Sequence, residues 1–132
     1  GGVVVVDDYS HHPTEIKATL STVRDMKYNN IWCVFQPHTY TRTKTLFDDF
    51  VKVLTESGVN IIITDIYAAR EKDTGIVSAQ QLANAIPNAV FKKTFDEAAN
   101  FIKAQAKKGD IVITMGAGDV YKIGDILLSY NE

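Results

Sequence analysis

A three-layer α/β fold with a mostly parallel sheet of five to six strands is predicted by three features of the 132-residue sequence. Five short apolar runs are separated by segments with helical spacing, so strands and helices alternate along the chain. Three of these runs are almost continuously apolar, which is typical of parallel strands covered by helices on both faces. No repeat, low-complexity segment or internal linker interrupts the alternation, so we expect residues 1–132 to form a single domain.

The five apolar runs are the expected strands, and their order in the sheet does not follow from the sequence. In chain order they are Val3–Val6, Ile31–Phe35, Val59–Thr64, Ala89–Phe91 and Ile111–Met115. We expect the four valines of the first run to be buried. The run at 89–91 is short and weakly apolar, which favours an edge position. Cys33 is expected to be a small core residue, and Trp32 is expected to pack under a helix.

The expected helices carry apolar residues at spacings of three and four positions. The first follows Pro13, a residue that suits the first helical turn, and Gly58 ends the second. The apolar stripes and ranges are Ile16, Leu20, Val23 and Met26; Leu46, Phe50, Val53 and Leu54; Ala79–Ile86; Phe95, Ala98, Ala99, Ile102 and Ala106; and about Val120–Ser129.

The composition excludes several classes of protein. With 14 basic and 16 acidic side chains the net charge is −2, which gives no global attraction to nucleic acid or to a membrane surface. The single cysteine rules out an internal disulfide and favours a cytoplasmic setting. No membrane-spanning apolar run or signal-peptide pattern is present. Because the sequence lacks an initiator methionine and enters a strand at once, we expect an excised domain of a longer chain.

Titratable and aromatic residues gather in the segments that follow the strands. After the first, second, third and fifth strands come DDYSHHPTE, QPHTYTRTK, TDIYAAREKDTG and GAGD, which together hold all three histidines. The loops at the opposite edge, KYNN, ESG, IPN and KKGD, read as ordinary solvated turns. Ligands collect outside the carboxyl ends of parallel strands, because the loops vary there and helix N-termini offer free N–H groups. The sequence therefore predicts a ligand site at this edge.

Several of these residues also have a purely structural interpretation. Asp7 and Asp8 either face a ligand or simply carry the chain from the sheet into a helix. His11 and His12 indicate a metal only weakly, because neighbours on a turn seldom point at one ion and no HxxxH or CxxC accompanies them. We expect one of the two to be a helix cap or a loop hydrogen-bonding group. GAGD allows a close backbone approach but is not a dinucleotide fingerprint.

The segment after the second strand favours an anionic ligand. His38, Tyr40 and Arg42 alternate there and are interpreted as sharing one face. An arginine at the start of a helix is electrostatically unfavourable unless it meets an anion. The chain has no P-loop, nucleophile elbow or zinc signature, so we expect no catalytic residue and no metal ligand in it. The edge reads as one wall of a site whose other wall lies elsewhere.

Taken together and in order, DDYSHHPTEI, VFQPHTYTRT, DIYAAREKDTG and TMGAGD resemble the C-terminal domain of the bacterial Mur ligases. The resemblance covers essentially the whole chain. It is closest to the members that join L-alanine to UDP-N-acetylmuramate in peptidoglycan synthesis. DDYxHHPTEI followed by FQPHxYxRT is far more specific than any glycine motif.

The resemblance implies a three-domain enzyme with an N-terminal UDP-sugar domain, a central P-loop ATPase domain and this Rossmann-like domain. In such an enzyme ATP, with Mg²⁺, phosphorylates the muramoyl carboxylate, and the amine of L-alanine attacks the acyl phosphate. The C-terminal domain closes over the central one and contacts the nucleotide and the amino acid. We therefore expect the isolated chain to be inactive and to hold no cofactor alone.

Site residues carry over from the family by position. His11, His38 and Arg42 are expected to bind substrate, with the last two meeting the carboxylate of the amino acid. Asp8, Tyr9 and His12 are expected to bind the nucleotide: Tyr9 lines the cleft, and the other two support its loop.

One position departs from the family pattern. Many relatives carry a second arginine where this chain has Thr39. Either His38 and Arg42 suffice here, or a neighbour such as Arg70 substitutes.

A receiver-type phospho-acceptor signalling domain is the alternative. Such domains also have two acids at the end of the first strand, and Asp65 here ends the third strand, as a phosphorylated aspartate would. A receiver also needs a lysine at the end of the fifth strand, where this chain has Met115 and Gly116. The alternative leaves the histidine-rich segments unexplained.

Overall fold

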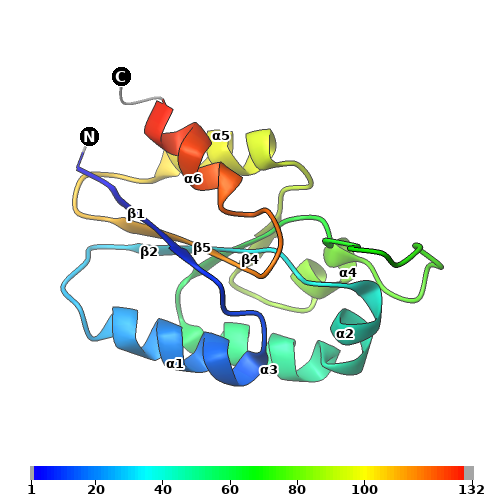
Figure 1. Cartoon of the computed structure of the whole chain (residues 1–132). Helices are drawn as coiled ribbons and strands as arrows, with labels where there is room; N and C mark the ends of the chain where they lie inside the picture. Colours follow the sequence, from blue (N-terminus) through cyan, green and yellow to red (C-terminus); the bar gives the residue numbers. More distant parts are fainter. Residues whose placement is uncertain (1, 130–132) are drawn as a thin grey trace.

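The computed structural model describes residues 2–129, which form a five-stranded parallel sheet between two layers of helices (Figure 1). The strands are β1 (Val4–Asp8), β2 (Ile31–Phe35), β3 (Asn60–Ile63), β4 (Ala89–Phe91) and β5 (Ile111–Met115). Their order in the sheet is β1-β5-β2-β3-β4, and every neighbouring pair is parallel. The predicted fold class is confirmed, and so is the edge position of 89–91.

Six helices connect and cover these strands within the described residues. They are α1 (Pro13–Arg24), α2 (Tyr40–Thr45), α3 (Phe47–Ser57), α4 (Ala79–Asn84), α5 (Phe95–Gln105) and α6 (Lys122–Ser129). Helices α1, α3 and α4 pack on one face of the sheet, and α5 and α6 pack on the other. None of the helices between residues 2 and 129 combines the length and apolar character that crossing a bilayer requires.

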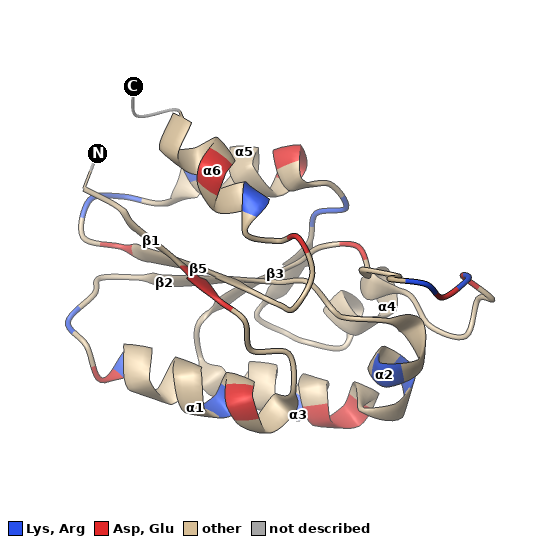
Figure 2. Ribbon diagram, in the orientation of Figure 1, with Lys and Arg blue, Asp and Glu red and all other residues tan. Residues whose placement is uncertain are grey.

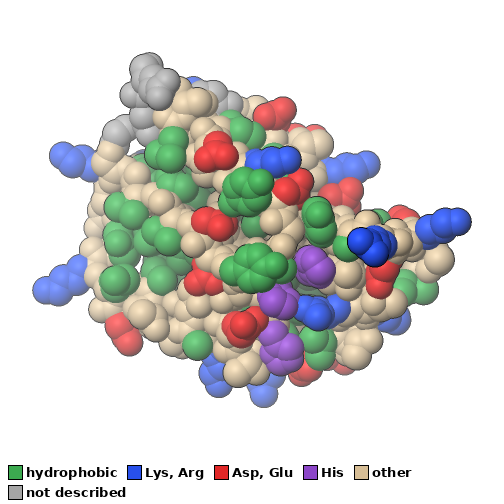
Figure 3. All heavy atoms as spheres, viewed as in Figure 1, with side chains coloured by type: hydrophobic (Ala, Val, Ile, Leu, Met, Phe, Trp, Pro, Cys, Tyr) green, Lys and Arg blue, Asp and Glu red, His purple; other side chains and the backbone are tan. Residues whose placement is uncertain are grey.

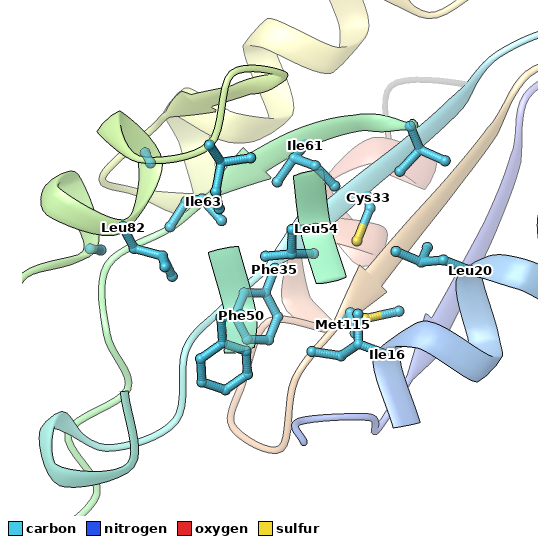
Figure 4. Packing of buried hydrophobic residues seen from close by; sticks show 14 of the residues in the cluster. Ile16, Leu20, Cys33, Phe35, Phe50, Leu54, Ile61, Ile63, Leu82 and Met115 are labelled. Carbon is cyan, nitrogen blue, oxygen red and sulfur yellow. The ribbon is translucent and has the colours of Figure 1, made fainter. Parts of the chain in front are cut away.

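The larger core lies between the sheet and the α1, α3 and α4 layer (Figure 4). Phe35 of β2 and Phe50 of α3 are both buried, and their rings lie 5.3 Å apart. Cys33 is fully buried, as expected, and burial raises the pKa of its thiol to about 12. On the opposite face the Trp32 ring meets Phe101 of α5 edge-on at 6.3 Å, which confirms that Trp32 packs under a helix.

The position of β5 determines where a ligand crevice opens. β5 lies between β1 and β2, although it is last in the chain. Both neighbours lead into helices of the α1 and α3 layer, whereas β5 leads into α6 on the other face. Loops that leave adjacent strands toward opposite faces separate, so the crevice lies at the carboxyl ends of these three strands.

The expectation that the first valines are buried is wrong. β1 is an edge strand paired only with β5, and Val4 and Val6 are each 42% exposed. The strand also extends further than expected, since Asp7 and Asp8 pair in register with Thr114 and Met115. An apolar run shows that a strand forms but does not show how many neighbours it has.

Helix boundaries differ by a few residues from the expected ones. α1 ends at Arg24, so Met26 lies beyond the helix and is 52% exposed rather than part of its apolar face. α4 ends at Asn84, and α6 begins at Lys122.

The interpretation of KKGD as an ordinary solvated turn is wrong. Asp110 is completely buried. Its carboxylate accepts hydrogen bonds from Asn30 N (3.1 Å) and Nδ2 (3.3 Å), Trp32 Nε1 (3.1 Å) and Lys107 N (2.9 Å). Burial acts to raise the pKa of Asp110, but these hydrogen bonds outweigh it and hold the pKa below its ordinary value. Asp110 thus ties together the segments that enter β2 and β5.

Candidate functional site

The segment after β1 is anchored to α1 by Asp8. One oxygen of its carboxylate accepts from Ser10 N (2.7 Å), and the other accepts from the Thr19 hydroxyl (3.1 Å). Asp7 accepts from the hydroxyl of Thr114 on β5 (2.7 Å). These contacts are those of residues that shape the loop. Acidic residues, coloured red, lie at the carboxyl end of β1 (Figure 2).

His12 is the N-cap of α1, which confirms that one of the two adjacent histidines is a helix cap. Its Nδ1 accepts from Thr14 N at 3.2 Å. Glu15 completes the cap by accepting from the backbone N–H groups of His11 (3.3 Å) and His12 (3.1 Å), and these bonds hold its pKa below the ordinary value.

Tyr9 and His11 lie beside this cap. The two rings meet edge-on with centroids 5.8 Å apart, and His11 Nδ1 lies 3.2 Å from the carbonyl oxygen of Tyr9 and 3.7 Å from Glu15 Oε1. Tyr9 is 69% exposed, which is unusual for a large aromatic side chain, whereas the His11 ring is partly buried. The loop therefore presents an exposed aromatic ring beside a partly buried imidazole.

The segment after β2 places His38 against the segment after β3. Tyr67 N donates to the carbonyl of Pro37 (2.9 Å), and Thr39 N donates to the carbonyl of Tyr67 (2.8 Å). These two bonds extend the β2–β3 pairing past the end of the sheet. The ring of His38 stacks on the ring of Tyr67, with centroids 5.5 Å apart and planes 25° apart.

The predicted edge brings the three histidines together on one face of the molecule (Figure 3). The rings of His11 and His38 lie 6.0 Å apart, although they come from different loops. Nδ1 of His38 is buried and has no hydrogen-bond partner among residues 2–129. Burial lowers the pKa of His38, and the nearby charges of Arg42 and His11 lower it further. His38 is therefore a neutral imidazole near neutral pH.

Arg42 is half-buried in the first turn of α2 and supplies a cation at this face. Its backbone N–H donates to the Thr39 hydroxyl (3.3 Å), and within residues 2–129 its guanidinium has no salt-bridge partner. Tyr40 packs against the core instead, so the expected shared face is wrong for this residue. Arg70, considered as a substitute for the arginine absent at Thr39, is exposed.

The anion that the start of α2 requires is supplied by Glu71. One oxygen of this carboxylate accepts from Tyr40 N (2.6 Å) and Thr41 N (3.1 Å), and the other accepts from the Thr41 hydroxyl. The bond from the Thr41 hydroxyl is the largest of the effects that hold the pKa of Glu71 below its ordinary value. No pattern in the sequence pointed to Glu71, although it lies in one of the four segments at the predicted edge.

The GAGD segment after β5 packs against the other loops. Gln36, only 4% exposed, donates from Nε2 to Asp119 (2.9 Å). A Cβ atom on Gly118 would lie 2.6 Å from both Gln36 Oε1 and the Tyr67 ring, so only glycine fits. The close approach expected of GAGD is thus made to neighbouring side chains of this chain. The sequence analysis did not single out Gln36, Tyr67 or Asp119 as parts of the site.

These segments place the guanidinium of Arg42, which has no salt-bridge partner among residues 2–129, at the same face as the neutral ring of His38, the partly buried ring of His11 and the exposed ring of Tyr9. Within residues 2–129 no group of three or more His, Cys, Asp or Glu side chains is arranged to hold a metal ion. The described residues therefore do not fit a Mg²⁺ site.

The sequence is similar to those of known ligases. The family described as "Mur ligase, glutamate ligase domain" matches residues 1–118. The UDP-N-acetylmuramate–L-alanine ligases of Clostridium beijerinckii and Clostridium acetobutylicum are each 52% identical to this chain, over 94% and 97% of it. The chain spans only 28% and 29% of the length of these relatives.

Solved structures show the same fold. The UDP-N-acetylmuramate-alanine ligase of Thermotoga maritima matches 98% of this chain with a TM-score of 0.75 at 22% identity, over 26% of its own chain. A domain of a putative ligase from Haemophilus ducreyi matches 99% of this chain and 93% of its own, with a TM-score of 0.65 at 24% identity. The receiver alternative gains no support from these matches. The chain belongs to the Mur ligase family and corresponds to its glutamate ligase domain.

Proposed function

We propose that this chain is the C-terminal domain of a cytoplasmic three-domain ligase that joins L-alanine to UDP-N-acetylmuramate in peptidoglycan synthesis. The domain contacts the incoming amino acid and the nucleotide, while a central ATPase domain and an N-terminal UDP-sugar domain supply the rest of the site. The muramoyl carboxylate is activated by ATP as an acyl phosphate, which the amine of L-alanine attacks. The identity of about half of all residues to ligases of this name supports the choice of amino acid.

The observation that carries the proposal is the uncompensated guanidinium of Arg42 beside the neutral ring of His38. A guanidinium binds a carboxylate through two parallel hydrogen bonds, and a neutral imidazole adds a donor without a second charge to desolvate. His11 borders the same space from the β1 side. These three residues bind the carboxylate end of L-alanine.

The nucleotide lies on the β1 side of the crevice in this proposal. Tyr9 offers an exposed ring, and Asp8 and His12 hold its loop through their bonds to Ser10, Thr19 and Thr14. Mg²⁺ and the triphosphate are held by the central domain, so the isolated chain has no ligase activity. ATP supplies the phosphoryl group, and the residues described here only help to position it.

Substitution of Arg42 in the full-length ligase tests the proposal. Arg42→Ala is expected to raise the Michaelis constant for L-alanine about 10- to 100-fold, as the loss of one charge-assisted contact does. Arg42→Lys recovers only part of this loss, because an ammonium does not reproduce the two parallel bonds. The Michaelis constants for ATP and UDP-N-acetylmuramate are expected to stay within about twofold of wild type.

Lys44→Ala is the matched control, since Lys44 is an exposed cation on the same helix. It is expected to leave all three constants unchanged. A rise confined to ATP after Arg42→Ala moves Arg42 to the nucleotide side and refutes the assignment. An unchanged constant for L-alanine refutes it as well.

A further inference from the structure

We propose that Glu71 is a positioning residue for the amino-acid carboxylate: by capping α2 it fixes Arg42 and His38 in their binding geometry. The inference rests on the proposed function, because it concerns the same carboxylate site. Glu71 itself does not touch the ligand in this proposal. Its role is exerted through the backbone of the helix that carries Arg42.

Helix α2 has only six residues, too few to be stable on its own. Its first N–H groups all depend on side chains: Tyr40 and Thr41 donate to Glu71, and Arg42 donates to Thr39. Glu71 therefore accepts from two of the three backbone N–H groups in the first turn, and from the Thr41 hydroxyl as well.

The loop that carries Glu71 is held in place by backbone hydrogen bonds. Tyr67 connects it to the β2 side through bonds to Pro37 and Thr39. Glu71 N donates to the carbonyl of Ala68 (3.0 Å), which closes a turn in which Ala69 has a φ of 56°. The carboxylate thus comes from a closed turn fixed to the same backbone that carries His38.

The charge of Glu71 also stabilises α2, because a negative group at the start of a helix offsets the positive end of the helix dipole. Glu71 fills this position and yet forms no salt bridge with Arg42 among the described residues. The carboxylate stabilises the helix that carries the guanidinium without occupying the guanidinium. Its charge also reaches His38, because Glu71 opposes the downward shift in the pKa of that residue.

The test compares three substitutions in the full-length ligase. Glu71→Ala removes all three hydrogen bonds and is expected to raise the Michaelis constant for L-alanine about tenfold, within the range that loss of a helix cap gives. Glu71→Gln keeps an acceptor without the charge and is expected to show a smaller rise. Thr41→Val removes one hydroxyl donor with little change in volume, and about a twofold rise is expected.

Comparing the Michaelis constants of the three substrates distinguishes a positioning role of Glu71 from a general loss of structure. The constants for ATP and UDP-N-acetylmuramate stay at wild-type values if Glu71 acts through Arg42 and His38. Asp73→Ala is the control, because Asp73 is an exposed carboxylate of the same loop whose bond is to Gly75 N. An unchanged constant for L-alanine in Glu71→Ala, or an equal rise for all three substrates, overturns the inference.

Arg42→Ala measured in parallel distinguishes the two proposals. If Arg42→Ala raises the constant for L-alanine and the Glu71 and Thr41 variants do not, the inference about Glu71 fails alone. If Arg42→Ala has no effect on L-alanine either, the proposed function of the site fails, and the inference fails with it.

Discussion

Buried polar groups are arranged differently at the two ends of the parallel strands. The amino edge is the side of the sheet where the strands begin, and the carboxyl edge is the side where they end. At the amino edge Asp110 is fully buried, and its carboxylate accepts four hydrogen bonds. Among residues 2–129 four buried side-chain atoms have no partner; Gln36 Oε1, His38 Nδ1 and Thr64 Oγ1 lie at the carboxyl edge, and Thr55 Oγ1 lies in α3. Burying an unpaired polar atom costs free energy, so such atoms are rare in folded proteins. Their concentration at one edge marks that edge as built for something other than stability.

The backbone shows the same difference. Among residues 2–129 the two non-glycine residues with positive φ are Thr39 (65°) and Ala69 (56°), and both lie at the carboxyl edge. Such conformations cost about 1–3 kcal/mol each and persist where the surrounding contacts enforce them. The amino edge thus satisfies its buried carboxylate and stabilises the fold, whereas the carboxyl edge keeps most of the unpaired buried polar atoms and both strained non-glycine residues, as the proposed ligand site would require.

The largest effect is expected at the amino edge. Asp110→Ala leaves the N–H groups of Asn30, Trp32 and Lys107 without their acceptor, and we expect the free energy of unfolding to fall by about 3 kcal/mol. Urea denaturation of the 132-residue chain measures this value. Glu56→Ala, at an exposed carboxylate, is the control and is expected to change stability by less than about 0.5 kcal/mol. A loss that small for Asp110→Ala would remove the contrast between the edges.

The effect of Asp110→Ala on stability is also expected to depend on pH. The folded-state pKa of Asp110 is below its ordinary value, so its contribution is complete above the unfolded-state pKa and is lost as pH falls through the folded-state value. The difference in stability between wild type and Asp110→Ala is therefore expected to shrink between about pH 5 and about pH 2. A difference that stays constant over this range contradicts a role for the charge.

An intermediate effect is expected for Gly118 at the carboxyl edge. Gly118→Ala places a methyl group 2.6 Å from the Tyr67 ring and from Gln36 Oε1, so the ring that supports His38 has to move. We expect a loss of about 2 kcal/mol in the free energy of unfolding. In the full-length ligase the Michaelis constant for L-alanine is expected to rise as well.

Gly124→Ala provides the comparison, because its methyl group meets only Val5 Cγ1 at 3.3 Å. The expected change is below about 1 kcal/mol, with no effect on L-alanine. Equal stability losses for the two glycine variants contradict the close packing at Gly118.

The smallest effect is a gain in stability. Thr39 has a φ of 65° and a ψ of 150°, which glycine adopts without strain. Thr39→Gly relieves this strain but loses the cap on Arg42 N, so we expect a net stabilisation of about 1 kcal/mol. Thr94→Gly is the matched control, since Thr94 caps α5 from an ordinary extended conformation. Urea denaturation is expected to show stabilisation for Thr39→Gly alone, and destabilisation of both variants contradicts the strain.

The fold was largely predictable because its signals are local. Apolar runs and helical spacing identified all five strands of the described chain, and the asymmetry between the loops located the site at the carboxyl edge. The exposure of Val4 and Val6 was not predictable, since it follows from the placement of β5 between β1 and β2. Pairing order depends on contacts between distant segments, which periodicity does not record.

The residues proposed to face the ligand could be picked out in the sequence, whereas the residues that support them could not. His11, His38 and Arg42 stand out in the sequence because their types are unusual at those positions. In the sequence Glu71 and Asp110 look like ordinary surface acids. Only the structure shows which backbone N–H groups donate hydrogen bonds to them. A carboxylate that satisfies the backbone of a distant segment leaves no pattern in its own neighbourhood.

The insertion of β5 has a consequence for the order in which the domain is made. β1 leaves the ribosome before the other four strands of this domain but pairs only with β5, and Asp7 meets Thr114 across a separation of 107 positions. Until residues 111–115 have been synthesised, β1 has no strand to join, and the loop that carries His11 has no fixed place. Closure of so long a loop comes late in folding. The His11 and His38 rings therefore come together only after β5 has been synthesised. A chain that ends before β5 is expected to lack the proposed anion site.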